Sequence, residues 1–342
     1  MRFPLSLVLS MSRYIAGKKW SGQKRFSLVL MLEPSHRCNL RCQGCGRIRE
    51  YQSTLNQSLT VQECLDAVEE CGAPTVSVCG GEPLLYDGLE ELLVGILQVP
   101  SRHVYLCTNG VLLEERLDQL CSALTKQMKK RLFINVHLDG PASIHDQFAG
   151  KPGLFDQAMT GLIAAKKARL AVYTNTTVYR QTTIDLLIEL GEALRKVPID
   201  GMMISPAFGF ESVNDSEQRI FMTRSEIKSF FHDVRRRMKR YRLTATPLFF
   251  DFLEGRLQLD CAAWANPTRN VCGWRSPCYL IGDRHEASWQ ELLENTDWNA
   301  IGPGRDHRCE HCMTHCGFEP AAVLKPIGPL NMIRLAWWQL FS

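Results

Sequence analysis

Three cysteines, Cys38, Cys42 and Cys45, stand at the spacing CxxxCxxC directly after an apolar run. Four thiolates close a tetrahedral zinc site or complete the ligand set of a cubane iron–sulfur cluster. Three leave one coordination position open, and an open position is where a metal centre reacts. The motif alone therefore leaves two alternatives, a reactive iron–sulfur centre or a zinc ion whose fourth ligand lies elsewhere in the chain.

A second cysteine group lies near the end of the chain and consists of Cys261, Cys272, Cys278, Cys309, Cys312 and Cys316. Cys309, Cys312 and Cys316, together with Cys278, could supply four thiolates to a second cluster or to structural zinc. The neighbouring His307, His311 and His315 widen the choice of ligands. From the sequence, this group holds a second cluster, zinc or nothing.

Six apolar runs of strand length alternate with helical patterns, at residues 27–33, 76–79, 104–107, 132–138, 170–178 and 201–205. Thr60 and Glu63 form a capping box that starts one of the helices, on which Cys64 and Cys71 share one face and are predicted to be core residues. Six strand–helix units predict an α/β fold, a partial (β/α)6 barrel followed by a cysteine-rich C-terminal extension. Glycine-rich or polar turns follow the strands, and ligands bind at that end of such sheets.

The bulk composition is that of an ordinary folded protein, with 342 residues, 45% hydrophobic residues and a net charge of +4. Fourteen cysteines without a secretion signal indicate a reducing compartment, so we expect a cytoplasmic protein. We predict four segments. They are a basic and apolar N-terminal segment (1–26), the barrel (27–206), the extension (207–325) and an apolar tail (326–342).

Both ends of the chain suit a membrane surface. Residues 3–15 combine apolar side chains with arginines, and residues 333–341 contain Trp337 and Trp338. Tryptophan and basic side chains are favoured at the level of the lipid headgroups, so one expectation is peripheral contact with the inner face of the membrane. The alternative is that both ends pack on the domain or fray.

The cysteine loop and the turn Gly80-Gly81-Glu82-Pro83 together resemble the radical S-adenosylmethionine (SAM) superfamily. The resemblance implies a 4Fe-4S cluster on Cys38, Cys42 and Cys45, with SAM bound to its open iron. It also implies that Gly80, Gly81, Glu82 and Pro83 hold the methionine end of SAM. Asn175 and Ser205, at the ends of two strands, are the residues expected to contact its ribose or carboxylate.

A closer match is carried by CNLRCQGCGRI, GGEPLLY, VYLCTNG and VHLDG in the barrel and by ISPAFGFE, PLFFDFLEG, NPTRNVCGW, SPCYL and CMTHCGFEP beyond it. In their order and in their residues, these strings resemble the radical SAM adenosylhopane synthase family of hopanoid biosynthesis, also called adenosyl-hopene transferases. The match runs from about Tyr14 to Val323. It departs at Arg47, where lysine is expected, in residues 50–57, and in the tail.

The resemblance implies that the 5′-deoxyadenosyl radical adds to the terminal alkene of diploptene and that SAM is consumed as a co-substrate. Cys107, in the string CTN, is then the expected hydrogen-atom donor, because a thiol S–H bond is weaker than an alkyl C–H bond. The implied partners are diploptene and a flavodoxin- or ferredoxin-type electron donor, with no nucleic acid. The apolar strands and several aromatic residues are expected to line the substrate site, namely Phe208, Phe210, Phe249, Phe250 and Trp274.

Two other functions fit parts of the sequence. The first is a radical SAM enzyme with an auxiliary cluster that modifies a peptide or tRNA, which would use the extension and the basic run at residues 235–240. The second is a zinc-stabilised binding protein without catalysis.

Overall fold

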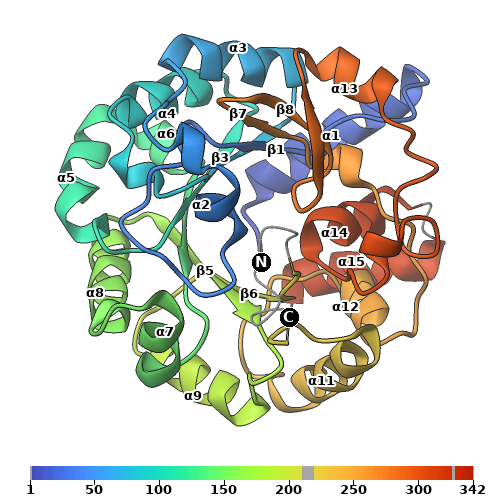
Figure 1. Cartoon of the computed structure of the whole chain (residues 1–342). Coiled ribbons are helices and arrows are strands. Elements are labelled where there is room, and N and C mark those ends of the chain that lie inside the picture. The colour runs from blue at the N-terminus through green and yellow to red at the C-terminus, as the bar shows by residue number, and fades with distance from the viewer. Residues whose placement is uncertain (1, 210–218, 326–327, 342) are drawn as a thin grey trace.

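The computed structural model describes residues 2–209, 219–325 and 328–341, and its centre is a curved sheet surrounded by helices (Figure 1). The first six strands are β1 (Val29–Leu32), β2 (Thr75–Val78), β3 (His103–Thr108), β4 (Leu132–His137), β5 (Ala171–Val178) and β6 (Gly201–Pro206). They lie in the order β6-β5-β4-β3-β2-β1, and each pair of neighbours is parallel. The predicted (β/α)6 arrangement is confirmed.

The helices cover the outer face of this sheet. They are α3 (Val61–Cys71), α4 (Leu89–Leu97), α5 (Leu113–Ala123), α6 (Lys126–Lys129), α7 (Ala142–Ala149), α8 (Leu154–Lys167) and α9 (Ile184–Leu194). The short helix α2 (Gly46–Glu50) follows the cysteine loop and lies inside this ring of helices (Figure 1). The predicted capping box is present, because Thr60 and Glu63 cap each other's backbone at the start of α3. Cys64 and Cys71 are buried in the core between sheet and helices, as predicted.

The inner face of the sheet has two layers. Near the amino ends of the strands, Tyr105, Phe133 and Tyr173 pack together, with ring centroids 4.9–6.0 Å apart. Nearer the carboxyl ends the inward side chains are polar and include Cys107 and Asn135, which are directly paired across β3 and β4. Successive residues of a strand point to opposite faces, so each strand is aliphatic outside and aromatic or polar inside.

The extension continues the same sheet from its β1 edge. Its strand β7 (Thr268–Asn270) pairs in parallel with β1, and β8 (Gly273–Pro277) and β9 (Gly282–Glu286) follow antiparallel. The sequence did not predict these strands, because β7 has three residues and lacks an apolar run. The helices of the extension are α11 (Arg224–Arg237), α12 (Pro247–Leu253), α13 (Trp289–Asn295) and α14 (His315–Leu324).

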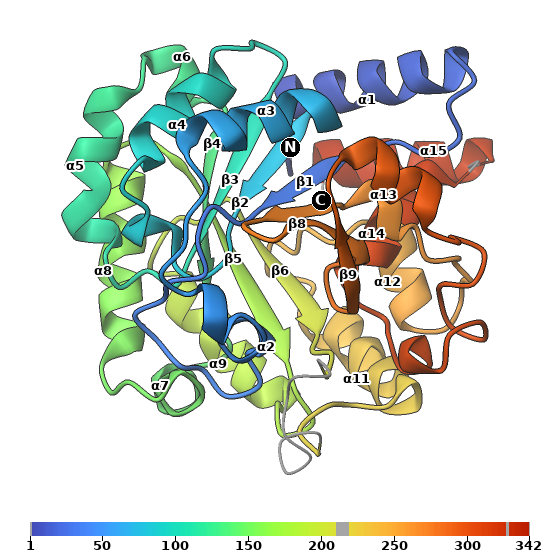
Figure 2. The ribbon, with the colours of Figure 1, turned by 45° about the horizontal axis from the view of Figure 1, so that its top comes forward.

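Both ends of the chain form helices, α1 (Leu5–Trp20) and α15 (Pro329–Phe341), which lie toward the same side of the molecule (Figure 2). Arg2 donates its backbone N–H to the Gln339 carbonyl, at 2.9 Å. Leu7 is buried against Phe133 and Tyr173, so α1 covers the aromatic layer of the barrel. Within the described ranges, no helix is long and apolar enough to cross a membrane. The four segment boundaries given above remain predictions.

Candidate functional site

Cys38, Cys42 and Cys45 lie on the loop between β1 and α2, and all three are half-buried. The loop turns sharply, because Cys45 donates its N–H to the Cys42 carbonyl and Gly44 adopts a left-handed φ of +73°. Burial and the neighbouring thiols raise the pKa of Cys38 to about 11 and that of Cys42 to about 12. The thiols are therefore close enough to repel one another as thiolates, and a bound cationic centre would relieve this repulsion.

The turn that contains Gly80 and Gly81 packs tightly on the segment that leads into Cys38. Gly80 has a φ of +109°, and a Cβ at Gly81 would lie 2.0 Å from the Arg37 carbonyl oxygen. Gly81 and Glu82 donate their N–H groups to the carbonyls of Ser35 and Arg37, at 3.0 and 2.7 Å. The space beside these glycines is filled by the chain's own backbone, so their direct role here is to hold two loops together. Their expected contact with SAM remains a prediction.

Glu82 connects this turn to the end of β3. Its buried carboxylate accepts hydrogen bonds from the Thr108 hydroxyl at 2.7 Å, the Asn109 N–H at 2.8 Å and the Leu84 N–H at 3.0 Å. The Asn109 amide in turn donates to Asn39 Oδ1, at 2.7 Å, beside Cys38. Glu82 thus positions the cysteine loop through Asn109. Pro83 is buried and starts a short 3-10 helix.

Arg47 fixes the other side of the cysteine loop. Its Nε lies 3.0 Å from Glu33 Oε1, and both side chains are buried. Its Nη2 donates to the Tyr279 carbonyl at 2.5 Å, and its guanidinium lies over the Tyr279 ring, 4.0 Å from the centroid. The guanidinium therefore links the end of β1, the helix after Cys45 and the extension.

Cys107 lies on the inner face of β3, where Ser77 Oγ is 3.3 Å and Asn135 Nδ2 3.6 Å from its Sγ. Burial raises the pKa of this thiol. At neutral pH it therefore carries the S–H hydrogen that a hydrogen-atom donor needs. Ser77 and Asn135 were not identified from the sequence. The available signal was the polar residue at every second position of otherwise apolar strands.

Asn175 shares this inner face, paired with His137 across β4 and β5. Its Oδ1 is buried and has no hydrogen-bond partner in the described parts of the chain. A buried polar atom of this kind needs a donor, and a hydroxyl or ammonium group of a bound SAM would supply one. Ser205, by contrast, is engaged within the protein, because its Oγ lies 3.1 Å from His315 Nδ1 on α14.

The expected apolar lining is wrong in two respects. The upper inner face of the barrel is polar, and Phe249, Phe250 and Trp274 are buried in the main core. Phe208 borders the cysteine group of the extension, and Phe210 lies outside the described residues. Among the described residues, the apolar side chains of these strands pack in the core against the outer helices.

Residues 32–194 match the family model described as the Radical SAM superfamily. This segment, a little under half of the chain, is therefore similar to a radical SAM domain. Members of this superfamily use a 4Fe-4S cluster and SAM, which are therefore the cofactors of this domain and favour iron–sulfur over zinc. Residues 202–334 match a second model, described as a domain of unknown function (DUF3463).

The curated relatives carry different activities. An AdoMet-dependent heme synthase of Oleidesulfovibrio alaskensis is 33% identical over 44% of this chain and 38% of its own length. A GTP 3′,8-cyclase of Clostridium perfringens is 27% identical over 55% of this chain and 59% of its own length. The chain thus spans about half the length of these relatives, and the similarity reaches only part of each protein.

Solved structures share the fold. The enzyme anSMEcpe with bound AdoMet superposes with a TM-score of 0.61 over 91% of this chain and 98% of its own, at 16% identity. SuiB of Streptococcus suis bound to its precursor peptide SuiA superposes with a TM-score of 0.62 over 88% of this chain and 73% of its own, at 14% identity. At these identities the likeness concerns the fold alone.

Proposed function

We propose that this chain is a radical SAM enzyme that adds the 5′-deoxyadenosyl group of SAM to the terminal alkene of diploptene, yielding adenosylhopane. Cys38, Cys42 and Cys45 would hold the cluster, and Asn175 and the Gly80–Pro83 turn would contact SAM. When bound, the cluster supplies one electron that cleaves SAM into methionine and the 5′-deoxyadenosyl radical. A flavodoxin- or ferredoxin-type protein is the proposed source of that electron.

Cys107 would complete the reaction. Addition of the adenosyl radical to the terminal alkene carbon forms a C–C bond and leaves a tertiary carbon radical on the substrate. Cys107 donates its S–H hydrogen atom to that carbon, and the resulting thiyl radical is restored by one electron and one proton. Each product therefore consumes one SAM, two electrons and one proton.

The protonated thiol on the inner face of the barrel is the observation that carries this proposal. Ser77 and Asn135 hold Cys107 at the carboxyl half of β3, near the loops that bear Cys38 and Glu82. Such a donor serves a reaction in which a carbon radical on the substrate is quenched by a hydrogen atom. A reaction that ends in a saturated adduct requires one.

The test is an anaerobic assay with diploptene, SAM and a reductant, followed by mass detection of the lipid product. Adenosylhopane from the wild-type chain supports the proposal, and 5′-deoxyadenosine without any lipid adduct contradicts it. Cys107→Ala should still cleave SAM but lose the saturated adduct, and Cys107→Ser should behave alike because an O–H bond is too strong. Cys121→Ala, a half-buried thiol on α5, is the matched control and should keep the wild-type yield.

The second candidate function is modification of a peptide or tRNA. The fold it shares with peptide-bound SuiB favours a peptide. The basic run offers less support for tRNA, because Arg235 pairs with Asp251 and Glu254, and Arg237 pairs with Asp185. Two results would together favour this candidate. Diploptene would remain unmodified in the assay above, and an added peptide would stimulate SAM cleavage by the enzyme.

We also propose that the terminal helices bind an anionic membrane surface on the cytoplasmic side. With the exception of Ile163, the exposed large apolar side chains of the described residues lie on α1 and α15, namely Leu5, Leu9, Trp20, Leu330, Met332, Ile333, Trp337 and Leu340. Neither helix contains Asp or Glu, and α1 ends in Lys18 and Lys19. Apolar side chains flanked by uncompensated positive charge fit the headgroup region of anionic lipids.

Vesicle flotation tests this surface. The wild-type chain should float with vesicles that contain phosphatidylglycerol and stay unbound with pure phosphatidylcholine. The double variant Trp20→Ala/Ile333→Ala should lose most binding, whereas Ile163→Ala, on α8, removes an exposed apolar side chain elsewhere and should keep it. Equal flotation of both variants, or concentration-dependent dimers in place of flotation, would contradict the proposal.

A further inference from the structure

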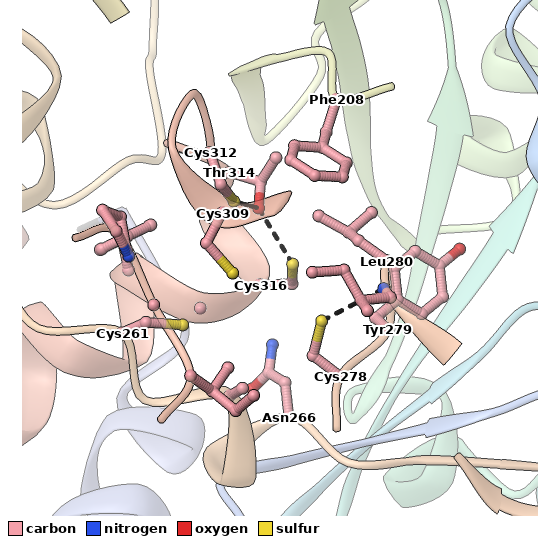
Figure 3. A pocket seen from close by; sticks show the side chains of 17 residues that line it. Phe208, Cys261, Asn266, Cys278, Tyr279, Leu280, Cys309, Cys312, Thr314 and Cys316 are labelled. Atoms are coloured by element: carbon pink, nitrogen blue, oxygen red, sulfur yellow. Dashed lines mark hydrogen bonds between the residues drawn. The ribbon is translucent and has the colours of Figure 1, made fainter. Parts of the chain in front are cut away.

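Five cysteines of the extension surround one small cavity of about 20 Å³ (Figure 3). They come from separate segments, with Cys261 before the short helix at Ala263–Ala265, Cys278 after β8, Cys309 and Cys312 on the loop before α14, and Cys316 in the first turn of α14. The sequence placed Cys261 in this group, but the four ligands suggested there did not include it. The fold brings it in, because its Sγ packs directly against the backbone of Gly317.

The sulfur atoms are approached by hydrogen-bonding groups. Ile281 donates its N–H to Cys278 Sγ at 3.3 Å. The Thr314 hydroxyl lies between two sulfurs, 3.4 Å from Cys312 Sγ and 3.2 Å from Cys316 Sγ. Donors of this kind stabilise negative charge on metal-bound sulfur and are the outer contacts that tune metal sites.

Two arginines fix the backbone of the group and bring positive charge. Arg275 donates its Nε to the Cys278 carbonyl at 3.1 Å, and Arg224 donates Nη1 to the Cys312 carbonyl at 2.8 Å. Thiolates bound to a metal centre carry net negative charge. The Arg224 guanidinium therefore favours a loaded, anionic site over a set of neutral thiols, whereas the charge of Arg275 is paired with Glu50.

The neighbouring histidines stand apart from this group. His315 is bonded to Ser205 through Nδ1, and His307 and His311 are exposed to solvent. The ligand set is therefore made of thiols alone. Apolar side chains, among them Phe208, Ile281 and Phe318, complete the wall of the cavity.

We propose that four of these five cysteines bind a second iron–sulfur cluster. The five thiols line a cavity and come from separate segments of the chain. A zinc ion binds four ligands at one common point, whereas a cluster distributes its thiolates around several irons. The radical SAM domain already requires iron–sulfur assembly in the same cell, so the precursor is available to this chain.

The second site is joined to the first through Arg47. Tyr279, which lies under that guanidinium, follows Cys278 directly, and Arg47 follows Cys45 by two positions. The contact between Ser205 and His315 makes a second connection, from β6 to the helix that carries Cys316. A cluster bound by these cysteines would therefore hold the extension against the barrel, beside Cys38, Cys42 and Cys45.

The test counts metals and does not depend on the proposed substrate. The triple variant Cys38→Ala/Cys42→Ala/Cys45→Ala leaves the extension untouched. After anaerobic reconstitution and desalting it should retain about four irons and about four sulfides per chain, half of the wild-type content, with the broad visible absorption of a cluster. An iron-free triple variant would overturn the proposal, and so would one equivalent of zinc without sulfide.

A second pair of variants checks the ligands. Cys309→Ala/Cys312→Ala should lower the iron of the otherwise wild-type chain to about half. Cys121→Ala/Cys272→Ala removes two thiols outside the cavity and should leave the iron content unchanged. Circular dichroism identifies a variant that has lost its fold. A folded Cys309→Ala/Cys312→Ala chain with full iron content would refute the assignment.

Discussion

Replacing Arg47 by methionine should destabilise the protein strongly, because Arg47 is the main counter-charge of Glu33. The Glu33 carboxylate is 0% exposed and the Arg47 side chain 4%. After the change, the buried carboxylate would face His36 Nε2 at 3.4 Å and Asn270 Nδ2 at 3.3 Å. Breaking one side of a buried ion pair costs about 3–5 kcal/mol. At about 2 °C per kcal/mol for a large domain, the thermal midpoint should fall by roughly 6–10 °C.

With Arg47 in place, the Glu33 carboxylate is ionised at neutral pH. Burial alone would raise the pKa of Glu33, but Arg47 and His36 hold it at about 2 in the folded protein. Its folded pKa lies below its unfolded value of about 4.3, so the stabilisation is complete above that value and is lost as the pH falls towards 2.

A double-mutant cycle measures the pair. Glu33→Gln and Arg47→Met should each lower the thermal midpoint of the anaerobically reconstituted protein. The midpoint of the double variant should fall by much less than the sum of the two single losses. Arg195→Met removes an exposed pair with Glu192, where the side chains are 62% and 44% exposed, and should shift the midpoint by no more than about 2 °C. Additive losses, or an Arg47→Met midpoint equal to that of Arg195→Met, would refute the reasoning.

Three further outcomes follow from the geometry. Gly81→Ala places a Cβ 2.0 Å from a backbone carbonyl and should reduce both folded yield and iron content, whereas Gly17→Ala on α1 meets nothing within 4 Å and should stabilise by up to about 1 kcal/mol in thermal unfolding. Glu82→Gln removes an acceptor from one buried N–H, costs about 1–3 kcal/mol, and should weaken SAM cleavage by loosening Asn109, as read from 5′-deoxyadenosine release. Burial raises the pKa of Glu319 to about 7, so the stability that its protonated carboxyl contributes is complete below about pH 4 and is lost as the pH rises through 7. In Glu319→Gln, the thermal midpoint should therefore vary less between pH 5 and 8.

The sequence predicted the six parallel strands because each appears as a short apolar run. It predicted the helix start at Thr60 because a capping box is a local signal, and the box is present. The cysteine loop was recognisable for the same reason, since its chemistry lies within eight consecutive residues.

The sequence did not predict contacts between distant segments. The pairing of β7 with β1 joins residues more than 230 positions apart, and Arg47 meets Tyr279 across 232 positions. Cys261 joins the distal thiols only after the chain has folded. Ser77 and Asn135 were missed for a different reason, because the apolar runs were taken as uniform and their alternate inward positions were not separated.

The first turns of the N-terminal stretch close the barrel at the amino ends of its strands. Phe3 stacks on Tyr173 with ring centroids 6.1 Å apart, and Leu7 is buried on the same aromatic layer. An expression variant that begins after residue 20 would open the barrel floor to water and remove the partner of the C-terminal helix. Purification tags are for the same reason better placed in a loop than at either end.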